Sequence, residues 1–308
     1  MRAVILGGTG AIGGATAMRL RSAGWDVDVT GRDVASVPAE LIAAGVRFHT
    51  IERADVLGIG GLAGTGVDLL VDAVSYCGSD VRRLLPVMAD AASCVVISSR
   101  AVYVDDEGRH INGEEPPRFA VPLPETNPTV APATDVDPFS REGYAPGKVA
   151  VERAALDSGL PVTVIRPSKV HGRWARNART RPFVERMLAG DRVIPLPHAE
   201  AVDHLTAAVN TAALIEVVAH SPGRRILNSA DPDAPPAGDI VRSIASRLGW
   251  NGTLEVVHAE DGMNPWSAAN PIVLDMTAAA QLGYVPQGSA LELLSDEVDW
   301  VAAVLRAT

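Results

Sequence analysis

Apolar runs alternate with helix-like patterns through the first half of the chain. The runs are rich in Val, Ile and Leu and predict strands at 2–6, 26–30, 46–51, 68–74, 94–99 and 161–166. The stretches between them predict helices near 11–23, 38–44, 79–92 and 144–158. Nearly continuous apolar strands that alternate with helices are typical of a parallel sheet covered on both faces. We therefore predict an α/β fold, with a doubly wound parallel sheet in residues 1–170.

The second half of the chain has a less regular pattern. It predicts helices near 181–189, 204–219, 237–248 and 289–304, and short strands near 193–196, 225–228 and 254–257. We expect residues 171–308 to form a smaller lobe on the substrate side. Within that lobe, about 203–228 should pack back on the first domain.

A proline-rich segment at 105–140 follows neither the helical nor the strand period. An irregular stretch of this length inside a compact domain is either disordered or functional. We predict a lid that folds over the substrate side of the cleft and that moves more than the sheet when no ligand is bound.

The composition excludes several classes of protein. The chain has 308 residues, of which 47% are hydrophobic, so it can bury a sizeable core, and it has no apolar run long enough to span a membrane. A net charge of −10 argues against a general nucleic-acid binder. Two cysteines imply no disulfide framework, so the cytoplasm is the expected location. The histidines lack metal-ligand spacing, and we expect no metal.

A glycine-rich turn, "LGGTGAIGG", stands between the first predicted strand and the first predicted helix. Gly7, Gly10 and Gly13 permit a tight turn, a close approach of backbone to a pyrophosphate, and close packing of helix on strand. The helix N-terminus then offers free N–H groups to the phosphates. This position favours a dinucleotide site, formed by Gly7, Thr9, Gly10, Ala11, Ile12 and Gly13, over a plain tight turn.

Several motifs in order along the chain resemble one family. They are "GGTGAIG", "CVVISSRAVY", "YAPGKVAVERA", "TVIRPSKVHG", and "LGYVP" followed by "VDW". Together the motifs resemble the extended and atypical short-chain dehydrogenase/reductase superfamily, which includes NAD(P)-dependent sugar-nucleotide epimerases. The resemblance covers nearly the whole chain and implies a Rossmann domain and an enzyme that moves a hydride to or from a nicotinamide. It also assigns Lys148 and Pro167 to the cofactor site.

Tyr144 and Lys148 stand four residues apart in the predicted helix near 144–158, and Lys148 is one of only two lysines. That spacing places both on one helix face, where an ammonium would lower the pKa of the phenol towards neutrality. The resemblance implies that Tyr144 exchanges a proton with the substrate oxygen, while Lys148 holds the nicotinamide ribose. Ser99 would orient the substrate oxygen, with Ser98 as its competitor.

The end of the second predicted strand indicates the cofactor. An NAD-selective site would place an acidic residue where Gly31 stands, and Arg32 follows it. Glycine leaves room for a 2′-phosphate and arginine supplies a forked donor, so NADP(H) is favoured over NAD(H). Asp33 could still reach the ribose. Glu52 and Asp55 are either adenine contacts or solvated charges.

Departures from the family pattern narrow the chemistry. Arg100 and Ala101 replace the acidic pair that sugar-nucleotide dehydratases carry, so dehydration is disfavoured. His171 replaces a tyrosine and either contacts the substrate or fills space. The segment "GRWARNARTR" either clamps an anionic substrate group or forms a solvated basic turn, and its arginines are Arg173, Arg176, Arg179 and Arg181. Our candidate substrate residues are Arg100, His171, Arg173 and Arg176.

These observations converge on an NADP(H)-dependent oxidoreductase acting on a hydroxyl or ketone of a sugar-like or other polar small molecule. Reduction and epimerisation both remain open. The alternative is a non-catalytic relative that senses nucleotide or binds RNA, against which the joint presence of Ser99, Tyr144 and Lys148 speaks. We expect no nucleic-acid or membrane partner, and a homodimer stays open.

Overall fold

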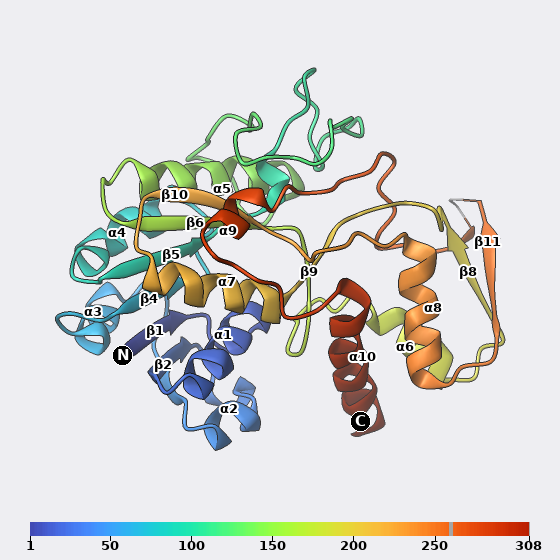
Figure 1. The fold of residues 1–308 in the computed structure, drawn as a ribbon, viewed down its shortest axis with the longest axis horizontal. Helices are drawn as coiled ribbons and strands as arrows, with labels where there is room; N and C mark the ends of the chain where they lie inside the picture. The colour runs from blue at the N-terminus through green and yellow to red at the C-terminus, as the bar shows by residue number, and fades with distance from the viewer. Residues whose placement is uncertain (259–260, 308) are drawn as a thin grey trace.

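A seven-stranded parallel sheet forms the centre of the computed structural model, which describes residues 1–258 and 261–307 (Figure 1). The strands lie in the order β10-β6-β5-β4-β1-β2-β3. Their bounds are β1 Arg2–Leu6, β2 Asp26–Gly31, β3 Arg47–Thr50, β4 Leu69–Asp72, β5 Ser93–Ile97, β6 Val162–Pro167 and β10 Arg225–Ser229. β1 pairs with both β2 and β4, so the strand order reverses there, as in other doubly wound sheets. The predicted fold class is confirmed.

Helices cover both faces of this sheet, as strands that are buried on both sides require. One face carries α1 (Ala11–Ser22), α2 (Ala39–Ala43) and α7 (Ala208–His220), whose Leu20, Leu41 and Leu214 share one apolar cluster with the sheet. The opposite face carries α3 (Val56–Ala63), α4 (Gly78–Ala89) and α5 (Arg141–Leu156).

The second half of the chain returns to the sheet and then leaves it. β10 pairs with β6, α7 packs on α1, and α9 (Thr277–Gln281) contacts β10. A separate apolar cluster joins α6 (Arg181–Leu188), α8 (Ala237–Leu248) and α10 (Ala290–Ala307), beside the pair β8 (Val193–Pro197) and β11 (Thr253–Val257) (Figure 1). These elements form a smaller lobe, while the proposed division of the chain at residue 170 stays a prediction.

Several elements differ from the sequence expectation. α3 was not predicted, because its sequence VLGIGGLA is rich in glycine, a poor helix former, and the Asp55 carboxylate caps its first turn. The predicted helix 204–219 begins only at Ala208, because Leu205–Ala207 forms strand β9. β9 pairs with β7 (Lys169–His171), and both strands are too short to show a period.

The proline-rich segment 105–140 contains no helix or strand in the part of the chain that the structure describes. Leu123 anchors it, because its N–H and C=O bond to Val273 and Asp275 and its side chain is buried. At its end, the Phe139 ring lies 4.9 Å from the Tyr76 ring, beside the start of α5. The segment thus reaches the edge of the cleft described below, and its role as a lid remains a prediction.

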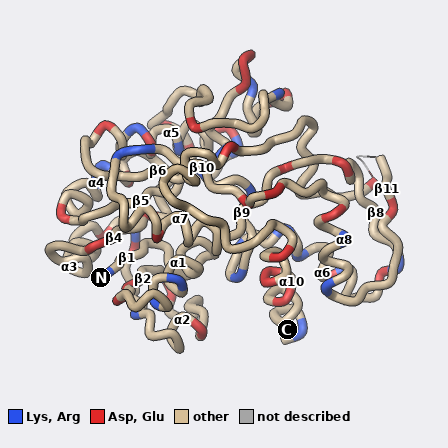
Figure 2. Tube along the Cα trace, in the orientation of Figure 1, with Lys and Arg blue, Asp and Glu red and all other residues tan. Residues whose placement is uncertain are grey.

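Charged residues of both signs are scattered over both lobes (Figure 2). Within residues 1–258 and 261–307, no helix has the length and apolar character needed to cross a membrane. In the same ranges, no three His, Cys, Asp or Glu side chains lie together as a metal site would require.

A buried carboxylate on β2 makes the stability of the sheet edge depend on pH. Asp28 is 2% exposed and pairs with Arg47 (2.9 Å), His49 (2.8 Å) and Arg2 (3.2 Å). Burial alone would raise the pKa of Asp28, but hydrogen bonds from Arg47 and His49 outweigh it and lower the pKa from 3.8 to about 2. A depressed folded pKa stabilises the protein above the unfolded value, and that contribution is lost as the pH falls through the folded value.

We therefore expect Asp28→Asn to be less stable than wild type at neutral pH, with the difference shrinking between about pH 4 and pH 2. Urea denaturation across this range measures it. Asp26→Asn is the matched control, because Asp26 lies on the same strand but is exposed. A constant difference between wild type and Asp28→Asn down to pH 2 would contradict the assignment.

Candidate active site

A cleft of about 320 Å³ opens at the carboxyl edge of the sheet, next to the reversal of strand order between β1 and β4. Ligands bind open α/β sheets at this place, because the strands on either side of the reversal continue into loops that diverge. Gly7, Ala73, Ile97 and Pro167 bring the ends of β1, β4, β5 and β6 to the cleft, and Tyr144 and Lys148 bring α5.

The glycine turn forms one wall of the cleft. Gly7 has φ +82°, and a Cβ on Gly13 would stand 2.4 Å from the Gly7 carbonyl oxygen, so both positions require glycine. Gly10 is the N-cap residue of α1, and no side chain caps that helix end among the described residues. Gly10, Ala11 and Ile12 line the cleft, whereas Thr9 lines a neighbouring cavity. The turn therefore presents uncapped helix N–H groups to a phosphate, which fits the predicted dinucleotide.

Lys148 lies deep in the cleft and is 3% exposed. Its Nζ donates hydrogen bonds to the carbonyl oxygens of Ser75 (2.7 Å) and Ile97 (3.0 Å). The same atom lies 4.7 Å from the centre of the Tyr76 ring and 5.9 Å from the Tyr144 ring. α5 sets this geometry because Ser140 caps its start and Tyr144 and Lys148 follow one turn apart.

The pKa of Tyr144 corrects one sequence expectation. We expected Lys148 to lower it, but burial raises it above the usual value, and a hydrogen bond with Ser99 acts in the opposite direction. The ammonium of Lys148 is occupied by two carbonyls, and burial lowers its own pKa from 10.5 to about 8, against the attraction of Asp72. Tyr144 is therefore a protonated phenol at neutral pH, suited to donate a proton.

The two serines that end β5 have different partners. The Ser98 hydroxyl donates to the Glu152 carboxylate at 2.5 Å and is buried. Ser99 accepts from the Ala101 N–H at 3.1 Å, and its side chain also hydrogen-bonds Tyr144. Of the pair, Ser99 is thus the serine beside the Tyr144 hydroxyl.

Sequence reasoning missed an ion pair between Arg53 and the buried Asp72, whose charge acts on Lys148. Asp72, at the end of β4, accepts two hydrogen bonds from Arg53, at 3.0 and 2.6 Å, and is fully buried. Arg53 also donates to the Ser75 hydroxyl (3.2 Å) and so fixes the loop whose carbonyl holds Lys148. A single acid after a strand carries no signal that its partner stands nineteen residues earlier in the chain.

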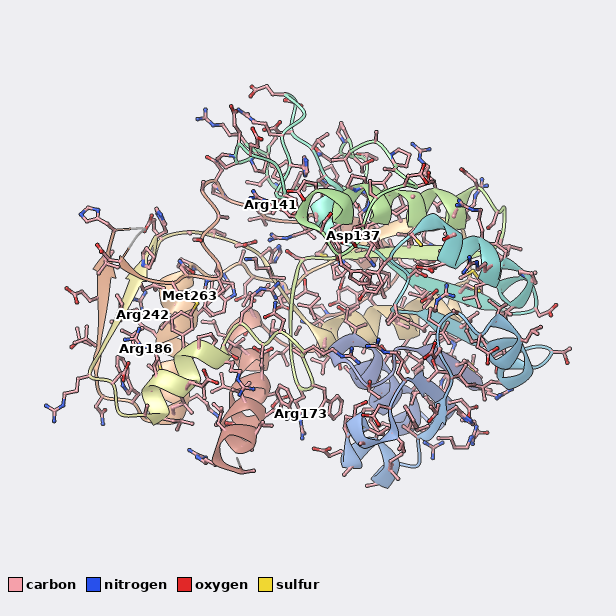
Figure 3. The ribbon with its side chains drawn as sticks, turned by 180° about the vertical axis from the view of Figure 1, so that it is seen from behind. Asp137, Arg141, Arg173, Arg186, Arg242 and Met263 are labelled. Carbon is pink, nitrogen blue, oxygen red and sulfur yellow. The ribbon has the colours of Figure 1, made fainter. Side chains whose placement is uncertain are left out.

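The candidate substrate residues separate in space. Arg176 lines the cleft and is exposed. Arg173 pairs with Glu40 at 2.6 Å and lines a different cavity. In Figure 3 it lies well away from Asp137 and Arg141 near the start of α5. His171 is buried against Asp231 at 2.9 Å and lines that same other cavity. We therefore leave Arg173 and His171 out of the site proposed below.

Arg100 is also buried, 5% exposed, and is paired with Asp203. The position directly after Ser99, where a dehydratase would carry an acid, is thus occupied by the paired cation Arg100. Arg179 and Arg181 were part of the arginine-rich segment, and they point to different neighbours: Arg179 lines the cleft, whereas Arg181 pairs with Glu185 on α6.

Arg32 follows β2 as an exposed side chain that makes no ion pair or hydrogen bond with the described residues. Asp33 caps a short turn by accepting from the Ala35 N–H at 2.9 Å. A Cβ on Gly31 would stand 2.8 Å from the Phe48 ring, so any larger residue at position 31 would have to displace that ring. Glu52 and Asp55 are exposed, and Asp55 caps α3.

By architecture, the chain belongs to the class of Rossmann folds with an appended smaller lobe. No protein-family model matches it, and no curated protein matches its sequence. Solved structures do match over almost the whole chain. The UDP-glucose 4-epimerase of Thermotoga maritima is 19% identical with a TM-score of 0.73, and the match covers 99% of this chain and 100% of that one.

Two further matches have similar values. The UDP-glucuronic acid 4-epimerase of Bacillus cereus, solved with UDP-glucuronic acid and NAD, is 15% identical with a TM-score of 0.71, over 99% and 100% of the two chains. The dTDP-glucose 4,6-dehydratase of Bacillus anthracis, solved with NAD, is 18% identical with a TM-score of 0.70, over 97% and 96%. At these identities the matches establish the fold, and the fold expected from the sequence resemblance is confirmed.

Proposed function

We propose that this protein is an NADP(H)-dependent oxidoreductase that acts on a hydroxyl or ketone of a sugar-like or other polar small molecule. The observation that carries the proposal is the meeting of Tyr144 and Lys148 with the glycine turn at one cleft, with Ser99 hydrogen-bonded to Tyr144. The epimerases and the dehydratase that share the fold are consistent with this chemistry.

A nicotinamide dinucleotide would supply or accept the hydride. On this proposal, Gly7, Gly10 and Gly13 hold its pyrophosphate, Lys148 and Pro167 its nicotinamide end, and Arg32 its adenosine end. Tyr144 donates a proton to the substrate oxygen during reduction and accepts one during oxidation, and Ser99 orients that oxygen. Ser99, which hydrogen-bonds Tyr144, favours the phenolate left after the proton has moved, while Lys148 is assigned to the nicotinamide end of the cofactor.

Dehydration does not fit the residues after Ser99. Removing a proton and expelling water needs a general acid and a general base, and Arg100 is held in an ion pair. Epimerisation and reduction both fit, because an epimerase oxidises and then reduces the same carbon. A reductase exchanges its cofactor at every turnover and an epimerase retains it, so dinucleotide that stays bound through purification would favour the epimerase.

The preference for NADP(H) is supported by Arg32, an exposed cation with no partner among the described residues, next to a glycine. A hydrogen bond between ionised partners contributes about 1.5–3 kcal/mol. Since about 1.4 kcal/mol corresponds to tenfold, NADP(H) should bind about ten- to a hundredfold tighter than NAD(H). Because Asp33 would repel the 2′-phosphate, we expect a ratio of affinities in the lower half of this range. Two of the structural neighbours were solved with NAD, so the test must measure both cofactors.

Replacing Arg32 with alanine should weaken NADP(H) binding by about tenfold and leave NAD(H) binding unchanged, because only the 2′-phosphate loses a partner. Titration of both cofactors, followed by the fluorescence of the tryptophans, measures this. Arg242→Ala is the matched control, because Arg242 is an exposed arginine on α8, away from the cleft. Equal affinities of wild type for NADP(H) and NAD(H) would refute the preference.

A further inference from the structure

Three cations, Arg100, Lys169 and Arg179, interact with a single buried carboxylate, Asp203. Asp203, 3% exposed, pairs through Oδ1 with Arg100 and through Oδ2 with Lys169, the latter at 2.7 Å. Arg100 follows β5, Lys169 begins β7, and Asp203 precedes β9, so three distant segments meet here. Both oxygens of Asp203 are thereby occupied.

Arg179 is the third cation, and it faces the cleft. It lines the cleft together with Tyr144, and its Nη1 donates to the Val170 carbonyl oxygen at 3.2 Å. No carboxylate of the described residues forms an ion pair with it. The nearest acids are already engaged: Asp203 as above, and Glu297 by the Thr180 hydroxyl (2.6 Å) and the Gly172 N–H (2.7 Å).

The electrostatics agree with this geometry. Burial and the charge of Arg100 lower the pKa of Arg179, whereas Asp203, Glu297 and Tyr144 act in the opposite direction. Burial and the charges of Arg100 and Arg179 likewise lower the pKa of Lys169, against the attraction of Asp203. The three cations therefore repel one another, and an anion in the cleft would relieve that repulsion.

We propose that the substrate carries a carboxylate or phosphate group, and that Arg179 binds this group beside Tyr144. A guanidinium offers two parallel donors to either group. Arg100 and Lys169 are positioning residues: they hold Asp203 away from Arg179 and keep the region positive. Arg176, which is exposed and lines the same cleft, adds a second cation. The inference rests on the proposed function, since it places the anionic group next to the reacting oxygen.

Calorimetric titration of the full chain with inorganic phosphate and with acetate tests the proposal. The titrations are made without cofactor and with saturating NADP⁺, which fills the pyrophosphate site and leaves only other anion sites open. We expect one of the two anions to bind in the presence of NADP⁺. Arg179→Gln should weaken that binding by about tenfold or more, and Arg179→Lys, which keeps the charge but loses the fork, by less.

Arg173→Gln is the matched control, since Arg173 lies on the same loop but pairs with Glu40 outside the cleft. Preferential binding of phosphate identifies a phosphorylated substrate, and preferential binding of acetate a carboxylate. Equal anion affinity in wild type and both Arg179 variants, with unchanged thermal melts, would overturn the inference. Failure of both NADP⁺ and NAD⁺ to bind wild type would instead refute the proposed function. In that case, an anion that binds wild type without cofactor but does not bind Arg179→Gln would still support the anion site.

Discussion

Replacing Tyr144 with phenylalanine is expected to lower turnover by about a hundredfold or more, the usual contribution of a positioned acid or base. The variant keeps the ring, and therefore the packing beside Lys148, but loses the phenol. Burial raises the pKa of that phenol, so at neutral pH it carries the proton that reduction of a ketone consumes. Affinity for NADP(H) should stay near that of wild type, because the hydroxyl is assigned to the substrate.

The measurement is the loss of NADPH absorbance with a ketone that wild type reduces, together with a cofactor titration on the same samples. Tyr284→Phe is the matched control: the Tyr284 hydroxyl is buried and has no hydrogen-bond partner among the described residues. Its removal should leave turnover unchanged. Wild-type turnover in Tyr144→Phe would eliminate the proposed mechanism.

The second large effect concerns stability and arises from a buried ion pair between α5 and β6. Arg166 donates to both carboxylate oxygens of Glu152, at 2.9 and 2.6 Å, and the two residues are 2% and 3% exposed. Arg166→Met leaves Glu152 buried without its partner, so we expect the free energy of unfolding to fall by about 3–5 kcal/mol. Urea denaturation at neutral pH measures this loss.

The double variant Glu152→Leu with Arg166→Met serves as the control, because it removes both charges from the core. It should recover most of the lost stability, since replacing a whole buried pair by apolar residues is often neutral. If the double variant were as unstable as Arg166→Met alone, the loss would come from packing and not from an unpaired charge. Ser98 also bonds to Glu152, so the pair additionally fixes the end of β5 beside Ser99.

The sheet and the glycine turn were predictable because their signals are local. Gly7 and Gly13 belong to one glycine-rich turn, and Tyr144 and Lys148 to one helix. Their spacing in the sequence is therefore enough to predict that the members of each pair lie close together. α3 escaped prediction because its glycines oppose a helix that tertiary packing and Asp55 stabilise. β7 and β9 are three residues each, and only their mutual pairing defines them.

The charged part of the site was predictable only in outline. The sequence does not distinguish the arginines of "GRWARNARTR" from one another. In the fold, Arg173 pairs with Glu40, whereas Arg179 lines the cleft. Lys169 and Asp203 are thirty-four positions apart, and no local pattern shows that they meet. The predicted lowering of the Tyr144 pKa was wrong, because that pKa depends on burial, which the spacing of residues does not measure.

The contact between Gly31 and Phe48 restricts how cofactor choice could change in descendants of this chain. An acid at position 31, the usual means of selecting NAD, would collide with the Phe48 ring on the neighbouring strand. On the proposed preference for NADP(H), loss of Arg32 alone would weaken NADP(H) binding without creating a contact to the ribose diol. A smaller residue at 48 would therefore make room for an acid at 31. An acid placed at 31 while Phe48 is still present would crowd the ring. The residue on β3 that contacts position 31 therefore influences whether NAD selectivity can evolve.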